Sequence, residues 1–333
     1  MSNMSDILIF GAGGMVGQKL VNRIRTDGIA GDNGHTLTLH DIAFPASGQN
    51  IGRQVVGDIT DAGQIRSLVA ERPAIIFNLA SIVSGEAEEN FPKGWDINMF
   101  SMWHLLQAIR DEHLASSGSY SPRLVFTSSI AVFGGPYPDA IDDEFLAAPQ
   151  TSYGAQKLTC ETLLSDFSRK GYVDGISLRL PTICVRPGKP NKAASGFFSG
   201  IIREPLNGQT AILPVEDTVR HWHASPRSAA GFLTHAATLD TALLNNRRAL
   251  NLPGLSCTVA EQIEALRDIA GQDAVSRIAY IPNPDIQKIV AGWPRNFNPE
   301  RSLALGFRAE NSFREIIETY IAEDFNKADG ITM

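Results

Sequence analysis

Residues 7–17, I-L-I-F-G-A-G-G-M-V-G, decide the fold of this chain. The apolar run Ile7–Phe10 predicts a buried strand, and a helical pattern follows the glycines over Gln18–Arg25. The order is strand, tight turn and helix, which is typical of an α/β fold built on parallel strands. A glycine-rich turn alone is a weak signal, because many turns contain glycine, but here the flanking strand and helix supply the context that it needs.

Three glycines give this turn the spacing G-x-x-G-x-x-G. Gly11 permits the sharp turn, Gly14 lets a pyrophosphate approach the backbone, and Gly17 lets the helix pack closely on the strand. The helix N-terminus then offers N–H groups and the positive end of its dipole to the phosphates. We therefore predict a dinucleotide site here, with Met15 and Val16 as further contacts.

The second strand favours NAD as that dinucleotide. Residues 35–40, H-T-L-T-L-H, predict a strand that ends at Asp41. A carboxylate there can accept hydrogen bonds from a ribose 2′-hydroxyl and would repel a 2′-phosphate. No arginine follows before Arg53, so NAD is favoured over NADP. The alternative is an aspartate that caps the loop and contacts no ligand.

A third strand is predicted over Val55–Ile59 and runs into a turn. In a doubly wound sheet its end, Asp58 and Ile59, would lie near the adenine of the cofactor. Asp58 could also cap a helix over Ala62–Ala70, and the two roles are compatible.

The fourth strand, Ala74–Ala80 or A-I-I-F-N-L-A, is almost wholly apolar and is predicted to be buried on both faces of a parallel sheet. Ligands bind beyond the carboxyl ends of such strands. Leu79 and Ala80 are therefore candidate cofactor contacts, and Ser84 and Glu86 in the following loop are candidate groups for binding substrate hydroxyls.

Two polar positions lie near the next strand. Asn98 falls in a helix predicted over Trp95–Arg110, where it could bond to backbone in the core or take part in a proton relay. The strand Leu124–Thr127 then runs into Ser128 and Ser129, so these hydroxyls reach a carboxyl end where catalytic groups gather. Either serine could instead bond to its own backbone.

The segment Thr151–Lys157, T-S-Y-G-A-Q-K, begins a helix predicted to reach about Arg169. Its spacing puts Tyr153 and Lys157 one turn apart on the same helix face. An ammonium beside a phenol favours the phenolate, which could take a proton from a substrate hydroxyl. The alternative is an ordinary tyrosine and lysine on a helix surface, since Y-x-x-x-K often occurs by chance.

Composition excludes several classes of protein. The 333 residues carry a net charge of -7 without a long basic run, which argues against a nucleic-acid or anionic-membrane partner. No apolar run approaches the ~18 residues of a membrane span, and no signal peptide is visible at the N-terminus. The three cysteines show no metal spacing and, being odd in number, no disulfide framework. We expect a cytoplasmic location.

The rest of the chain predicts a second lobe. A sixth strand over Asp174–Val185 is followed by a stretch rich in Pro, Gly and Lys. We predict a doubly wound parallel sheet (a Rossmann fold) in residues 1–185, with a returning strand near 248–254. A smaller, discontinuous C-terminal α/β lobe for substrate binding is predicted over residues 186–247 and 255–333.

Four of these features together resemble the extended short-chain dehydrogenase/reductase superfamily, which includes nucleotide-sugar epimerases and dehydratases. They are the glycine spacing, the aspartate after strand two, the serine after strand five and Y-x-x-x-K 24 residues beyond Ser129. Aligning F-T-S-S-I-A-V-F-G with the epimerase pattern F-S-S-S-A-x-V-Y-G selects Ser129 over Ser128. The resemblance implies that Tyr153 is the base, that Lys157 favours its phenolate and bonds the nicotinamide ribose, and that Ser129 holds the reacting oxygen. It also gives Asn98 a place beside the cofactor, where it would help to order water, and suggests a homodimer through two helices.

A narrower resemblance is to the D-erythronate dehydrogenase family, whose members use NAD to oxidise the 2-hydroxyl of a four-carbon sugar acid. It lies in S-I-V-S-G-E-A-E-E-N-F, in the long segment Ser177–Leu206 and in H-A-S-P-R. The chain departs from sugar-nucleotide enzymes at Ser225-Pro226-Arg227, where those enzymes have a hydrophobic pair and an aspartate. This departure weakens the case for a nucleotide-sugar substrate.

A carboxylate substrate needs a cationic partner, and an arginine fork fits it best. Arg186 and Arg227 are the leading candidates, ahead of Lys192, although each arginine could equally be a surface residue paired with an acid. Thr182 and Asn191 are candidate hydroxyl-binding groups. His221 and His223 have a spacing that could bind a metal, but a third ligand is not evident, so we expect no metal.

Three functions follow. The first is an NAD-dependent dehydrogenase of a small sugar acid. The second is a nucleotide-sugar epimerase or dehydratase that keeps NAD bound and returns the hydride to the sugar. The third is a non-catalytic NAD-sensing protein, which ranks last because the tyrosine and the lysine are both present.

Overall fold

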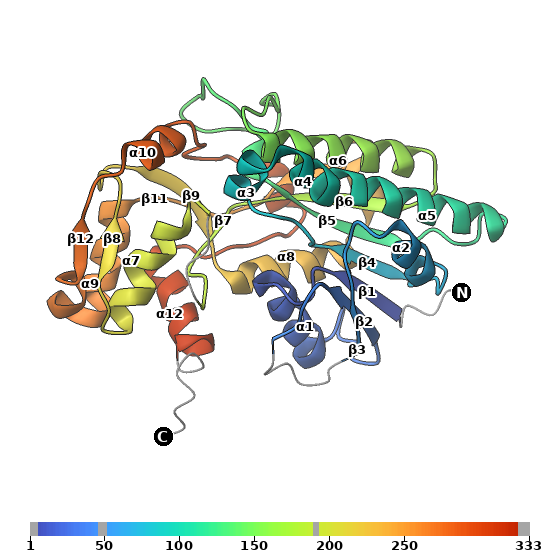
Figure 1. Cartoon of the computed structure of the whole chain (residues 1–333), viewed down its shortest axis with the longest axis horizontal. Coiled ribbons are helices and arrows are strands. Elements are labelled where there is room, and N and C mark those ends of the chain that lie inside the picture. The colour runs from blue at the N-terminus through green and yellow to red at the C-terminus, as the bar shows by residue number, and fades with distance from the viewer. Residues whose placement is uncertain (1–5, 46–51, 189–192, 326–333) are drawn as a thin grey trace. The chain divides into compact units, whose positions relative to one another are not determined.

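A computed structural model describes residues 6–45, 52–188 and 193–325 of the chain. The chain divides into two compact units, whose elements are labelled in Figure 1. The first unit comprises Met1–Val132, Pro149–Arg179 and Ala230–Asn251. The second comprises Phe133–Ala148, Leu180–Ala229 and Leu252–Met333.

The first unit is built on a seven-stranded sheet in the order β10-β6-β5-β4-β1-β2-β3. Its strands are β1 (Asp6–Phe10), β2 (Thr36–Asp41), β3 (Arg53–Val56), β4 (Ile75–Asn78), β5 (Arg123–Ser129), β6 (Asp174–Leu180) and β10 (Ala249–Asn251). The pairs β1–β2, β1–β4, β2–β3, β4–β5 and β6–β10 are all parallel. From β1 the sheet grows in both directions, with β2 and β3 on one side and β4, β5 and β6 on the other. The carboxyl ends of β1 and β4 therefore form the switch point where open α/β sheets bind ligands. The predicted doubly wound parallel fold is confirmed.

Helices cover this sheet. They are α1 (Met15–Asp27), α2 (Ala62–Val69), α3 (Ser84–Glu89), α4 (Phe91–Trp95), α5 (Ser101–Ala115), α6 (Ser152–Arg169) and most of α8 (Pro226–Thr238), with the short turns η1 (Asp96–Phe100), η2 (Ile130–Val132) and η3 (Thr241–Leu244). The turn η1 is a π-helix that leads straight into α5. Helix α6 begins and ends where its sequence pattern predicts.

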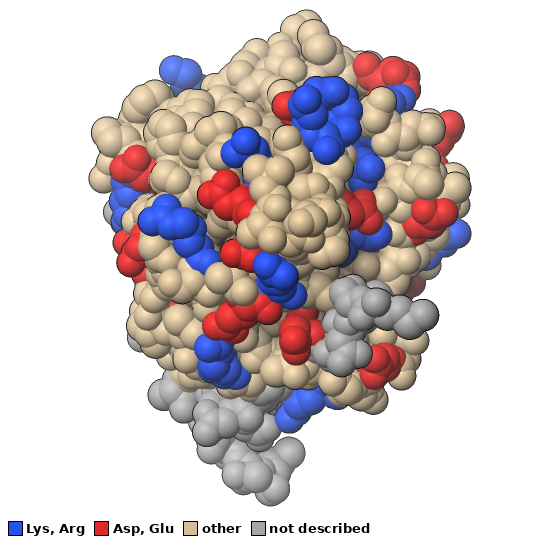
Figure 2. All heavy atoms as spheres, turned by 90° about the vertical axis from the view of Figure 1, so that its right-hand side faces the viewer, with Lys and Arg blue, Asp and Glu red and all other residues tan. Residues whose placement is uncertain are grey.

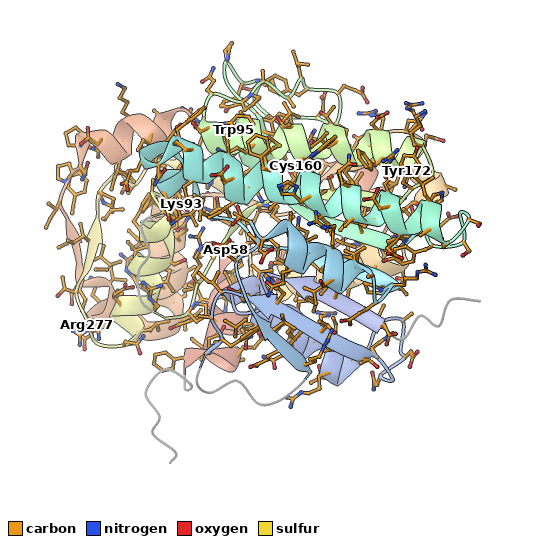
Figure 3. The ribbon with its side chains drawn as sticks, turned by 45° about the vertical axis from the view of Figure 1, so that its right-hand side comes forward. Asp58, Lys93, Trp95, Cys160, Tyr172 and Arg277 are labelled. Atoms are coloured by element: carbon orange, nitrogen blue, oxygen red, sulfur yellow. The ribbon has the colours of Figure 1, made fainter. Side chains whose placement is uncertain are left out.

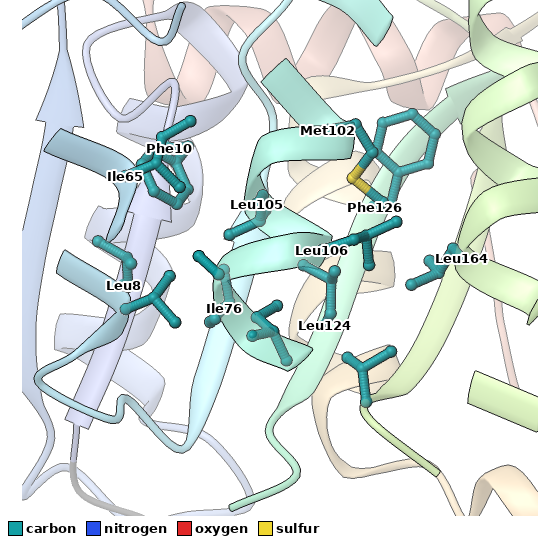
Figure 4. Packing of buried hydrophobic residues seen from close by; sticks show 14 of the residues in the cluster. Leu8, Phe10, Ile65, Ile76, Met102, Leu105, Leu106, Leu124, Phe126 and Leu164 are labelled. Carbon is teal, nitrogen blue, oxygen red and sulfur yellow. The ribbon is translucent and has the colours of Figure 1, made fainter. Parts of the chain in front are cut away.

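The core of the first unit lies between the sheet and helices α2, α5 and α6 (Figure 4). Every second residue of a strand faces it, as Leu8 and Phe10 of β1 do, and both are at most 1% exposed. Leu105 and Leu106 of α5 fill the space opposite. Burying one such side chain contributes about 1.5–3 kcal/mol, so this packing fixes the sheet whose ends carry the candidate site.

The second unit contains two small sheets. One has the order β11-β9-β7, from β11 (Leu255–Thr258), β9 (Arg220–Ala224) and β7 (Thr182–Ile183), and the other pairs β8 (Ala211–Leu213) with β12 (Ile278–Tyr280). Its helices are α7 (Gly196–Leu206), α9 (Val259–Val275), α10 (Pro284–Ala291), α11 (Glu300–Ala304) and α12 (Phe313–Glu323). Phe198, Leu266 and Ile316 lie at the centre of its own hydrophobic cluster.

This division differs from the predicted domain boundaries in four places. Residues 133–148, 180–185 and 252–254 belong to the second unit, and residues 230–247 belong to the first. The first unit takes residues 230–251 because β10 pairs with β6, with Ala249 opposite Ser177. That pairing confirms the predicted returning strand. Strand β9 was missed, because its letters R-H-W-H-A suggest a polar loop although four of its five residues are buried.

The charge of the surface and the apolarity of the helices concern two partners that the composition argues against, nucleic acid and membranes. The face in Figure 2 intermixes Lys and Arg with Asp and Glu side chains. None of the helices in the described ranges is long and apolar enough to cross a membrane. The three cysteines are buried thiols.

Candidate active site

Two glycines of the first loop are required by close backbone contacts. Gly11 has φ +81°, and a Cβ there would lie 2.6 Å from the backbone nitrogen of Ala80. A Cβ on Gly17 would lie 2.2 Å from the carbonyl oxygen of Gly11. Because neither backbone neighbour can move away cheaply, the loop after β1 packs against the end of β4 and against the start of α1.

Gly14 differs from its neighbours, because it faces open space. A Cβ on Gly14 would meet one atom within 4 Å, the carbonyl oxygen of Gly11, at 3.5 Å. Gly14 is also the N-cap of the 13-residue helix α1, which has no side-chain cap. An open glycine before uncapped helical N–H groups is what a pyrophosphate requires. Met15 and Val16, the further predicted contacts, form the first turn of this helix.

Asp41 lies at the end of β2, against the glycine loop. Its Oδ2 accepts a hydrogen bond from the backbone N–H of Gly13 at 2.8 Å, and its Oδ1 accepts one from Ile42. These bonds orient the carboxylate at the switch point and leave lone pairs on both oxygens. The glycine cradle and this acid together fit a dinucleotide with a free ribose 2′-hydroxyl.

The remaining predicted cofactor contacts lie around the same sheet edge. Leu79 donates its N–H to the carbonyl of Phe10 at the end of β4, so Leu79 and Ala80 lie beside the glycine loop. Asp58 accepts hydrogen bonds from Thr60, whereas the cap of α2 is Asp61, which accepts from Gly63 and Gln64. The predicted capping role of Asp58 is therefore wrong, because Asp61 lies directly before the helix.

Ile59, the second residue predicted to lie near the adenine, is 7% exposed. Its side chain belongs to the hydrophobic core beneath the sheet edge.

Tyr153 and Lys157 occupy the first two turns of α6. Thr151 caps this helix by accepting a hydrogen bond from the N–H of Gly154. The Lys157 ammonium is 1% exposed, lies 5.4 Å from the centroid of the Tyr153 ring and donates to the carbonyl of Thr127 at 2.9 Å. A buried, hydrogen-bonded cation and the positive end of the helix dipole thus lie beside the Tyr153 ring.

Gly154 brings this helix onto the end of β5. A Cβ on Gly154 would lie 2.1 Å from the carbonyl oxygen of Ala131, so no other residue fits without moving backbone. Ala131 in turn donates its N–H to the Oγ of Ser129 at 3.1 Å. The first turn of α6 thus packs against Ala131. This residue lies two positions after Ser129, the serine that the epimerase pattern selects.

The two neighbouring serines have different surroundings. Ser128 is buried, and its hydroxyl donates to the carboxylate of Glu161, which is ion-paired with Arg179. Within the described part of the chain, the Oγ of Ser129 accepts one hydrogen bond, from Ala131, and its hydroxyl proton has no acceptor there. This difference favours Ser129 for holding a reacting oxygen.

Asn98 lies within the π-helical turn η1 and is 2% exposed. Its Oδ1 accepts hydrogen bonds from the Ser81 hydroxyl and the Ile82 N–H, and its Nδ2 donates to Ile82 and to Oε1 of Gln156 at 2.7 Å. These four bonds use the whole hydrogen-bonding capacity of an asparagine amide. In this arrangement Asn98 holds the loop after β4, and its predicted places beside the cofactor and in ordering water stay predictions.

Gln156 lies in the motif T-S-Y-G-A-Q-K, but the sequence pattern assigned no role to it. It is wholly buried and joins α6 to the π-helical turn through Asn98. Its position three residues after Tyr153 was the available signal, because that spacing turns it to the same side of the helix. Through Asn98, Gln156 connects the helix of the candidate base to the loop after β4.

We expect Gln156→Met to lower kcat/KM about tenfold, because Asn98 would lose a buried partner worth about 0.5–1.5 kcal/mol and the loop would shift. Gly94→Ala should have the same effect, since its Cβ would lie 2.7 Å from Nε2 of Gln156. Gly200→Ala is the matched control, a helical glycine whose nearest neighbour would be 3.6 Å away. Steady-state kinetics of the three variants test this prediction. An unchanged kcat/KM in Gly94→Ala would contradict the coupling of Gln156 to the loop after β4.

The candidate substrate residues fall in both units. Ser84 begins α3, and Glu86 pairs with Lys93 (labelled in Figure 3) at 2.6 Å. Asn191, like Lys192, lies outside the described residues. Thr182 hydrogen-bonds His221 in the second unit.

The two candidate arginines of the second unit have different partners. Arg186 is half-buried and donates to the carbonyl of Ile183 and to the hydroxyl of Ser195, next to the start of α7. Arg227 is half-exposed and is ion-paired with Glu323 at 2.6 Å. Arg227 thus has the surface pairing that was its predicted alternative.

The Ser225-Pro226-Arg227 segment, where this chain departs from the pattern of sugar-nucleotide enzymes, is hydrogen-bonded to a carboxylate distant in sequence. Glu310 accepts hydrogen bonds from the Ser225 N–H at 3.1 Å, from the Ser225 hydroxyl and from the Ser228 hydroxyl at 2.8 Å. An acid more than 80 residues away in sequence therefore bonds the groups at the start of α8. No group of three metal-binding side chains occurs in the described part of the chain.

Comparisons with known proteins agree with this geometry. A D-erythronate dehydrogenase from Cupriavidus necator is 42% identical over 96% of this chain and 98% of that protein. A second, from Haemophilus influenzae, is 37% identical over 96% and 99%. A crystal structure described as a nucleoside-diphosphate-sugar epimerase from Agrobacterium tumefaciens has a TM-score of 0.91 and 50% identity, covering 98% of this chain and 97% of that one.

The predicted superfamily is confirmed by a family model as well. The NAD dependent epimerase/dehydratase family matches residues 7–239, which include the glycine loop, Asp41, Ser129 and the Y-x-x-x-K helix. The match also confirms the NAD cofactor that the family name carries. This chain belongs to the NAD dependent epimerase/dehydratase family.

Proposed function

We propose that this protein is an NAD-dependent dehydrogenase that oxidises the 2-hydroxyl of a small sugar acid such as D-erythronate to the 2-oxo acid. The observation that carries the proposal is the pair of relatives named D-erythronate dehydrogenase, which match this chain from end to end. The first unit supplies the supporting groups: a dinucleotide cradle, a tyrosine beside a buried ammonium and a serine hydroxyl with a proton to donate.

In this proposal Tyr153 is the base. Its phenolate takes the proton of the 2-hydroxyl while the Ser129 hydroxyl donates to the same oxygen as it becomes a carbonyl. Lys157, held by the carbonyl of Thr127, places its positive charge beside the Tyr153 ring. NAD, when bound by the glycine loop and Asp41, supplies the acceptor for the hydride that leaves carbon 2.

Arg186 is the preferred partner for the substrate carboxylate. Its guanidinium is half-buried and is held in place by hydrogen bonds to the carbonyl of Ile183 and the hydroxyl of Ser195, and its planar fork suits a carboxylate. Arg227 is already paired with the carboxylate of Glu323, so it is less suited to bind the carboxylate of the substrate. Ser84, Glu86, Thr182 and Asn191 remain candidates for the substrate hydroxyls.

The second candidate function is a nucleotide-sugar epimerase or dehydratase with tightly bound NAD. It is favoured by the name of the Agrobacterium structure, which is 50% identical to this chain. A non-catalytic NAD-sensing protein ranks last, since Tyr153 and Lys157 are both present and adjacent.

The deciding experiment is a screen of four- to six-carbon sugar acids with NAD and, in parallel, NADP. We expect net NADH formation with D-erythronate, and a preference for NAD because Asp41 would repel a 2′-phosphate. An epimerase returns the hydride and forms no net NADH. Interconversion of a nucleotide sugar, without turnover of any sugar acid, would therefore replace the first function by the second.

A homodimer and a cytoplasmic location stay predictions. Apolar side chains that remain exposed on η1 and α5 support the first: Phe100 is 46% exposed, Trp103 39% and Leu114 55%. Three buried free thiols support the second, because disulfides are rare in the reducing cytoplasm. Light scattering and cell fractionation measure these two properties.

A further inference from the structure

A hydrogen bond in the second unit joins Thr182 of β7 to His221 of β9. The Oγ1 of Thr182 lies 2.7 Å from the Nε2 of His221. The bond spans two neighbouring parallel strands, since Thr182 is opposite His223 in the register of β7 and β9. Thr182 lies two residues after the last residue of β6, Leu180, and the carboxyl ends of strands are where open parallel sheets place their ligand groups.

The direction of this hydrogen bond follows from the other nitrogen of the ring. The Nδ1 of His221 lies 2.9 Å from the carbonyl oxygen of Pro294, which can only accept, so Nδ1 carries a proton. Burial lowers the pKa of His221 to about 4, and the ring is therefore neutral near pH 7. A neutral ring with a proton on Nδ1 has none on Nε2, so Thr182 must be the donor.

The ring cannot easily turn to change this direction. His221 is 2% exposed, and the Phe198 ring stacks on it nearly in parallel, at 4° with 5.3 Å between centroids. Trp293 packs against it with its centroid at 5.1 Å. The tautomer is thus determined by a buried carbonyl and by packing, rather than by solvent.

A threonine hydroxyl has one proton, and His221 takes it. Among the described residues this is the one hydrogen bond that Oγ1 makes, so its lone pairs have no donor there, and Thr182 as a whole is only half-buried. We propose that Thr182 acts towards the substrate as a hydrogen-bond acceptor only, and that it thereby selects acids that carry a donor hydroxyl at carbon 3 or carbon 4. His221 is the positioning residue that imposes this direction.

This inference rests on the proposed function and deepens it. An acceptor-only oxygen repels a carboxylate or a carbonyl, so Thr182 cannot hold the acid group, which agrees with placing that group at Arg186 four residues along. It also cannot hold the 2-oxo group of the product. The hydroxyls that remain on a four-carbon sugar acid are those at carbons 3 and 4, and both can donate.

The test compares D-erythronate with its 3-deoxy and 4-deoxy analogues as substrates. The wild-type protein should prefer D-erythronate to one of the two analogues by about tenfold in kcat/KM, since the lost hydroxyl leaves the acceptor unpaired. Thr182→Val should reduce this preference to about one, and Thr182→Ser should keep it. His221→Phe should weaken it about threefold or more, whereas His221→Gln, which can accept from Thr182 and donate to Pro294, should restore it.

The ratio between substrates separates positioning from a merely structural role. A structural defect in His221→Phe would slow all three acids equally and leave the ratio unchanged, which would overturn the role of His221. An unchanged ratio in Thr182→Val would overturn the role of Thr182.

Nitrogen-15 NMR of the histidines tests the hydrogen-bond direction without any substrate. We expect His221 to be neutral with its proton on Nδ1 at pH 7, and its Nε2 resonance to shift in Thr182→Val. A proton found on Nε2 would overturn the inference even in an active enzyme. Failure of every sugar acid to yield NADH would reject the proposed substrate class and with it the selection by Thr182, while the NMR result would still decide the direction of the bond.

Discussion

Tyr153→Phe is expected to lower kcat by about 10²–10⁴-fold, the usual contribution of a positioned general base. The ring keeps its shape, its place in the first turn of α6 and its packing 5.4 Å from the Lys157 ammonium, and only the oxygen is lost. Steady-state NADH formation with the sugar acid identified by the screen measures the effect. Because the glycine loop and Asp41 are untouched, NADH affinity measured by fluorescence titration should change less than about threefold.

Tyr172→Phe is the matched control for this variant. Tyr172 also lies in the first unit, packs against aromatic rings and is labelled in Figure 3, but it follows the far end of α6. Loss of its hydroxyl should leave kcat unchanged. Near-normal turnover of Tyr153→Phe would remove the proposed base, and an equal loss in both variants would point to a general defect in the helix.

The parts of this structure that were predictable depend on contacts close in sequence. The strand over Ile7–Phe10, the glycine turn and helix α1 follow one another, so a pattern of about 20 residues is enough to predict their order. The bounds of α6 were likewise predictable from its cap, Thr151, and from its periodicity. Such elements carry the cofactor loop and the tyrosine–lysine pair, which is why the family could be identified from sequence.

The parts that were not predictable depend on partners far apart in sequence. Asn98 bonds to Ser81, Ile82 and Gln156, and its bond to Gln156 spans 58 residues, so a single-sequence pattern could not show these partners. The buried strand β9 is polar in sequence because His221 has the carbonyl of Pro294 as its partner, 73 residues further on. Buried polar groups are tolerated only with such partners, which a local pattern does not show.

The different surroundings of Ser128 and Ser129 also depend on partners far apart in sequence. They lead to a second prediction with a large expected effect, on the free energy of unfolding. Arg179 of β6 donates to both carboxylate oxygens of Glu161 on α6, and also to Asn251 of β10. The side chains of Arg179 and Glu161 are 14% and 4% exposed. This network joins three elements of the first unit and accepts the proton of Ser128, which supports the proposal that Ser129 is the hydroxyl that holds the reacting oxygen.

Arg179→Met is therefore expected to lower the free energy of unfolding by about 3–5 kcal/mol at neutral pH, because it leaves the Glu161 carboxylate buried without a counter-charge. Removing both charges together, in Glu161→Leu with Arg179→Met, should cost much less than the sum of the single changes, since neither partner is then left unpaired. Urea unfolding of the two single variants and the double variant measures this coupling. The double variant should also keep most of its turnover, because the network orients Ser128 and not Ser129. If turnover fell as far as in Tyr153→Phe while the fold remained stable, Ser128 rather than Ser129 would be the hydroxyl that holds the reacting oxygen.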